Sequence, residues 1–112
     1  MRMIELQDKF VEEIVRSIEV RWDSIHLNYE NMTVDGNNRE IHTAFYFTDG
    51  VKHQFSPALD AIDVLLELND CQPEGQADKW TWVEFVVDRL GKYEFDYKYD
   101  MPPHIATALR YS

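Results

Sequence analysis

The stretch that decides the fold is Trp80-Thr81-Trp82-Val83-Glu84-Phe85-Val86-Val87-Asp88, followed by Arg89-Leu90-Gly91 and then Lys92-Tyr93-Glu94-Phe95-Asp96-Tyr97-Lys98-Tyr99-Asp100. The last segment alternates aromatic and charged residues, a period of two that is typical of a half-buried β-strand. A three-residue loop that ends in glycine is a favoured hairpin connection, because glycine adopts the left-handed conformation at little cost. The sequence therefore predicts an antiparallel hairpin over residues 80–100.

The length of this loop sets the register of the hairpin and so defines its two faces. One face is wholly apolar, with Val87 opposite Tyr93, Phe85 opposite Phe95 and Val83 opposite Tyr97. On the other face Trp82 lies beside Lys98, and Glu84 lies directly opposite Asp96. Like charges that face each other across two strands are destabilising. We therefore expect this face to bind a cationic partner through Trp80, Trp82, Glu84, Glu94, Asp96 and Asp100.

The rest of the chain predicts two main helices and a three-strand meander. Apolar residues recur at helical spacing over residues 3–19 and from about 57 to 69, where we expect Ser56 as the N-cap and Pro57 at the first helical position. Strands are expected over residues 22–30, after the turn formers at 35–38, and after the three-residue loop 48–50. The second strand is expected to place Ile41, Thr43, Phe45 and Phe47 in the core, and residues 72–79 to form a polar loop.

These elements predict a single α+β domain over residues 1–112. An antiparallel sheet of about five strands, made of the meander and the C-terminal hairpin, is packed by the two main helices. One or two helical turns are expected over residues 104–111, after Pro102-Pro103 ends the hairpin. If this tail folds over the charged face, both hairpin tryptophans are structural, and if it does not, they are interface residues.

Composition restricts the class of partner. The chain has 21 acidic and 11 basic residues and a net charge of −10. Nucleic acid and anionic membrane surfaces are disfavoured partners, because binding them depends on Lys and Arg. A basic protein is favoured electrostatically, although acidity can also serve solubility alone. No apolar run approaches a membrane span and no signal-peptide pattern opens the chain, so we expect cytoplasmic residence.

Catalytic and metal chemistry find little support in the residues. Cys71 stands alone, which excludes an intrachain disulfide, and the histidines do not converge in the expected registers. In those registers His26 lies opposite Tyr46, His42 opposite Glu30, and His53 in the core opposite Phe45.

Glu84 and Asp96 could share a proton as an acid–base pair, so a small hydrolase stays an alternative. A structural or adaptor module that binds a protein ligand is a second alternative, and we expect no enzyme activity, cofactor or metal.

The segment from Trp82 to Asp100 resembles the closing part of the YezG-like antitoxin and immunity family, which ends in a strand, a Gly-Lys turn and an aromatic–acidic strand. The N-terminal amphipathic helix followed by Val20-Arg21-Trp22-Asp23-Ser24-Ile25 is also similar. This resemblance implies a small cytoplasmic bacterial protein that binds and neutralises a cognate toxin, often a nuclease, in a polymorphic or contact-dependent toxin system. A nuclease domain is basic because it holds phosphates, which agrees with the expected cationic partner.

Overall fold

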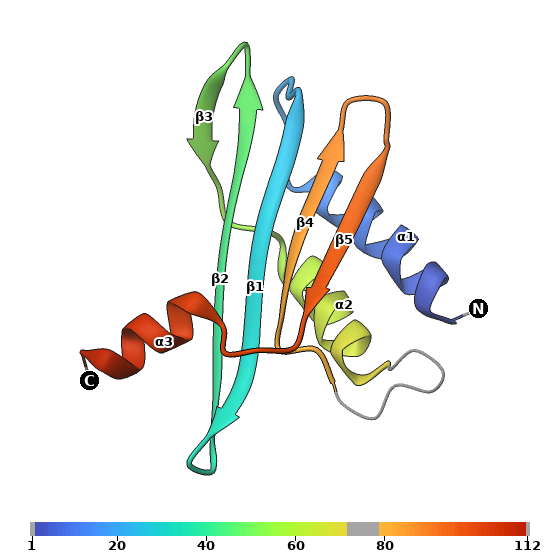
Figure 1. The fold of residues 1–112 in the computed structure, drawn as a ribbon. Helices are drawn as coiled ribbons and strands as arrows, with labels where there is room; N and C mark the ends of the chain where they lie inside the picture. The colour runs from blue at the N-terminus through green and yellow to red at the C-terminus, as the bar shows by residue number, and fades with distance from the viewer. Residues whose placement is uncertain (1, 72–78, 112) are drawn as a thin grey trace.

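The computed structural model describes residues 2–71 and 79–111, which form one antiparallel sheet and three helices (Figure 1). The strands lie in the spatial order β3-β2-β1-β4-β5. Their bounds along the chain are β1 Ser24–Val34, β2 Asn37–Thr48, β3 Val51–Gln54, β4 Trp82–Asp88 and β5 Tyr93–Lys98. The helices are α1 Arg2–Arg16, α2 Leu59–Asp70 and α3 Pro103–Arg110. The α+β class, the five strands, and the meander followed by a hairpin are confirmed, whereas the expected polar loop at 72–79 lies largely outside the described residues.

Two helices cover one face of the sheet, and the third lies over the other (Figure 1). The core between α1, α2 and the sheet is apolar because each strand turns alternate residues towards the helices. Its fully buried side chains include Phe10, Ile14, Ile25, Tyr29, Leu65, Leu68, Val83 and Val87. We call the opposite face, turned away from α1 and α2, the open face. Helix α3 contacts β1 and β2 on that face.

The meander has a register that differs by one residue from the expected one. Two-residue Asp-Gly turns join its strands, with positive φ at Asp35 and Gly36 and again at Asp49 and Gly50. This conformation matches the right-handed twist of the flanking strands, and Asp-Gly favours it. The three-residue loop expected at 48–50 is therefore wrong, and within the turn formers at 35–38 only Asp35 and Gly36 form the turn.

A shift of one residue moves every side chain of a strand to the other face. In β2 it is Ala44 and Tyr46 that face the helices, opposite Leu27 and Ile25 of β1. The expected core residues Ile41, Thr43, Phe45 and Phe47 lie instead on the open face. His26 lies opposite Phe45, His42 opposite Tyr29, and His53 opposite Tyr46, so none of the three expected histidine pairs forms. His53 is exposed and is not a core residue.

The start of α2 also differs from the expectation. The helix begins at Leu59, and its N-cap is Ala58, which makes no side-chain cap hydrogen bond. Ser56 is therefore not the N-cap, and Pro57 is not the first helical residue. The segment is tied to the end of α1 because the N–H of Ala58 donates to the hydroxyl of Ser17 at 3.0 Å, and Pro57 is buried. Ala58 is itself extended, with φ of −60° and ψ of 148°, so the helix begins at the residue after it.

None of the helices in the described part of the chain is both long enough and apolar enough to cross a membrane.

Candidate functional site

The hairpin presents its carboxylates on the open face, in the register predicted from the sequence. Glu84 lies opposite Asp96, Trp82 opposite Lys98, and Val86 opposite Glu94. Gly91 has a φ of +85°, the left-handed conformation that the turn requires. Glu84, Glu94, Asp96 and Asp100 are all exposed, and Trp82 is half-buried. We call these five residues the acidic hairpin surface.

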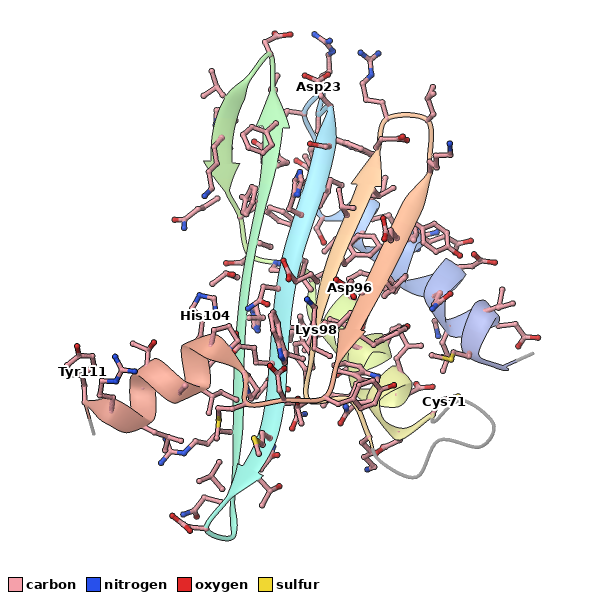
Figure 2. All side chains as sticks on the ribbon, viewed as in Figure 1. Asp23, Cys71, Asp96, Lys98, His104 and Tyr111 are labelled. Carbon is pink, nitrogen blue, oxygen red and sulfur yellow. The ribbon has the colours of Figure 1, made fainter. Side chains whose placement is uncertain are left out.

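Lys98 lies between the two opposed carboxylates. Its Nζ atom is 3.8 Å from a carboxylate oxygen of Glu84 and 3.4 Å from one of Asp96. The same ammonium lies 5.0 Å from the ring centroid of Trp82. Figure 2 shows Asp96 and Lys98 close together on β5. The like-charge repulsion expected from the sequence is thus partly compensated within the hairpin.

Trp82 and Asp100 are linked by a hydrogen bond. The indole Nε1–H of Trp82 donates to a carboxylate oxygen of Asp100 at 2.8 Å. This contact holds the segment after β5 against the start of β4. Asp100 therefore belongs to the same surface although it lies beyond the last residue of the strand.

Trp80 does not lie on this surface. It is 2 % exposed, its Nε1–H donates to the carbonyl of Leu68 at 3.3 Å, and its ring packs near those of Tyr29 and Tyr97. The prediction that Trp80 joins the partner-binding face is wrong. Strand β4 begins only at Trp82, after a bend at Thr81, so the alternation that relates residues of a strand does not extend to Trp80.

Aromatic side chains from β1 and β2 adjoin the acidic hairpin surface. The imidazole of His26 is stacked on the ring of Phe45, with centroids 4.9 Å apart and planes at 8°, and Phe47 meets the same imidazole edge-on. The ammonium of Lys52 lies 4.1 Å from the Phe45 centroid. Sequence reasoning missed these residues because the register expected from the sequence placed Phe45 and Phe47 in the core. The two Asp-Gly dipeptides were the signal that could have found them.

A hollow of about 320 Å³ lies where the aromatic and acidic groups meet. It is lined by His26, Leu27, Asn28, Phe45, Glu84, Phe85, Val86, Glu94 and Asp96, and we call it the open-face hollow. In the sheet, Phe45, His26, Val86 and Glu94 form one row across four strands. The hollow therefore has aromatic groups on the β1–β2 side and carboxylates on the β4–β5 side.

The surroundings of His26 favour the uncharged form of its imidazole ring. Burial, and then the nearby positive charge of Lys52, lower the pKa of His26 below its ordinary value. Its Nε2 atom lies 3.0 Å from the hydroxyl of Ser24. A neutral imidazole can take part in this hydrogen bond as donor or acceptor.

Another part of the open face is closed by α3. The Glu30 carboxylate is fully buried and accepts hydrogen bonds from the N–H groups of His104 and Ile105 at 3.2 and 2.9 Å. It also contacts Nδ1 of His104 at 2.6 Å and accepts from the Asn28 amide at 2.8 Å. Burial alone would raise the pKa of Glu30, but these hydrogen bonds together lower it below its ordinary value. Glu30 thus caps a helix that begins more than seventy residues later.

No group of three or more His, Cys, Asp or Glu residues is arranged to hold a metal ion within residues 2–71 and 79–111. No family model and no curated protein matches the chain.

Proposed function

We propose that this protein is a non-catalytic binding protein that takes up a basic protein partner on the acidic hairpin surface. More specifically, we propose an immunity protein that neutralises a cognate bacterial toxin in the cytoplasm, as the resemblance to the YezG-like family implies. The observation that carries the proposal is the set of exposed carboxylates beside a half-buried tryptophan on one sheet face. Glu84 and Asp96 are each 57 % exposed, so both are available to a partner.

Charge supports this choice of partner. The net charge of −10 attracts a basic domain and accelerates its encounter, by an order of magnitude or more at low salt. A toxin that cleaves nucleic acid carries such a basic surface, because it must hold phosphates. In addition, the interface positions that contribute most of the binding energy are often aromatic residues surrounded by charged ones.

The arrangement of Lys98 favours binding over the hydrolase alternative. Two carboxylates share a proton when their repulsion is uncompensated. Here the Lys98 ammonium lies within 4 Å of both Glu84 and Asp96 and offsets that repulsion. The pair is therefore better suited to meeting a cationic group than to acting as an acid and a base.

Protection of cells that express the toxin tests the proposal. For this test, the C-terminal domain of the protein encoded by the adjacent gene is expressed from an inducible promoter, with and without this protein. The double variant Glu84→Gln/Asp96→Asn removes two charges with little change in shape, and Glu12→Gln/Glu19→Gln removes two charges from exposed positions on the α1 side. We expect the wild type and the control variant to protect the cells, and the hairpin variant to fail.

Binding of the purified proteins gives the magnitude. Removing desolvated, paired carboxylates should weaken the complex by about 2–5 kcal/mol, mainly through faster dissociation. The control variant should change only the salt-dependent association rate. A hairpin variant that folds and still binds with unchanged affinity would show that the interface lies elsewhere. Failure of the wild type to protect cells against any neighbouring toxic domain would reject the immunity role itself.

A further inference from the structure

The open-face hollow combines flat apolar groups with carboxylates, and it is left uncovered by α3. Its aromatic part is the stack of His26 on Phe45, whose planes are nearly parallel. Strand β1 lies between β2 and β4, so the imidazole face turned away from Phe45 is turned towards Val86. Beyond Val86 lies Glu94, with Glu84 and Asp96 in the adjoining row.

The protein's own lysines already use both elements of this face. Lys52 places its ammonium over the Phe45 ring, and Lys98 places its ammonium between Glu84 and Asp96. These contacts are the two ways in which a cation is stabilised here, by an aromatic ring and by carboxylates. Glu94, at the end of the row, makes no ion pair with the other described side chains.

We propose that the open-face hollow receives an arginine side chain of the partner, with the guanidinium packed against His26 and Val86 and paired with Glu94. This inference rests on the proposed function, because it identifies which group of a basic partner enters that surface. Arginine fits better than lysine since its planar guanidinium is weakly hydrated, stacks on flat rings and can bind a carboxylate with two parallel hydrogen bonds.

The state of His26 agrees with a cationic occupant. Burial and Lys52 hold the pKa of His26 below its ordinary value, so the ring is largely uncharged at neutral pH and does not repel a guanidinium. The charged groups around the hollow come from three other strands, namely Lys52 on β3, Glu84 on β4, and Glu94, Asp96 and Lys98 on β5. Carboxylates thus outnumber cations around the hollow.

An NMR titration with small peptides tests the inference without the toxin. The ¹⁵N-labelled protein is titrated with blocked Gly-Arg-Gly, with Gly-Lys-Gly of the same charge, and with the uncharged citrulline analogue. We expect the arginine peptide to bind at least about threefold more tightly than the lysine peptide, and the citrulline peptide to bind least. The largest changes in amide chemical shift should occur at His26, Phe45, Val86 and Glu94.

Two isosteric variants locate the effect. Glu94→Gln should weaken binding of the arginine peptide at least threefold and reduce its preference over the lysine peptide, whereas Glu12→Gln on α1 should leave both unchanged. Equal binding of the arginine and lysine peptides, or shift changes centred on the α1 carboxylates, would overturn the inference. That result is independent of the cell-protection assay, in which the proposed function could still succeed through Glu84 and Asp96.

Discussion

Replacing Glu30 by glutamine should release α3 from the sheet while leaving the rest of the fold intact. The substitution keeps the size of the side chain but removes the charge and exchanges one acceptor oxygen for a donor. The two backbone N–H groups at the start of α3 and the imidazole of His104 then compete for one acceptor. Donors left without a partner in a buried place cost about 1–3 kcal/mol each.

The magnitude follows from the contacts that hold α3. Hydrogen bonds to a charged group contribute about 1.5–3 kcal/mol each, and those at one carboxylate are not additive. Losing roughly half of this network should therefore weaken docking of α3 by about 2–4 kcal/mol. The main apolar contribution that remains is the buried side chain of Ile105, worth about 1.5–3 kcal/mol, against the cost of ordering an eight-residue helix.

Hydrogen exchange of individual amides measures this docking. In Glu30→Gln, protection of the His104, Ile105 and Ala106 amides should fall by roughly 30- to 1,000-fold, the factor that corresponds to 2–4 kcal/mol. Amides of β1 and β4 should keep their protection. The matched control is Glu84→Gln, an exposed carboxylate on the same face. If α3 protection in Glu30→Gln stays within threefold of the wild type, Glu30 does not hold this helix in place.

Three further outcomes are expected. Because hydrogen bonds lower the pKa of Glu30 in the folded state, its stabilisation is present at neutral pH and lost as the pH falls through that pKa. Urea unfolding between about pH 7 and about pH 3 should therefore show a larger loss in the wild type than in Glu30→Gln. Trp80→Ala should cost about 3–5 kcal/mol of unfolding free energy and Trp82→Ala roughly 1, and similar values would contradict their different burial. Lys98→Met should cost less than about 1 kcal/mol at low salt, and a loss that does not shrink with added salt would argue against an ionic role.

The hairpin was predictable because its determinants lie within twenty residues. An unbroken alternation defines both faces, and a loop ending in Gly91 sets the register, so the positions of Glu84, Glu94 and Asp96 follow from local rules. The meander was predictable as three strands but not in its faces. Its register depends on whether each Asp-Gly forms a two-residue turn, and an error of one residue inverts a whole strand.

The sequence by itself determined the fold class, the order of the elements and the acidic character of the hairpin, since these follow from periodicity, turn residues and charge. Only the tertiary structure decided which aromatic groups adjoin those carboxylates, because Phe45 and His26 meet through strand pairing. It also decided that Trp80 is buried, through its packing against Tyr29, Tyr97 and the end of α2. Glu30 caps α3 across a long separation in the chain, and no local pattern encodes a contact between residues so far apart.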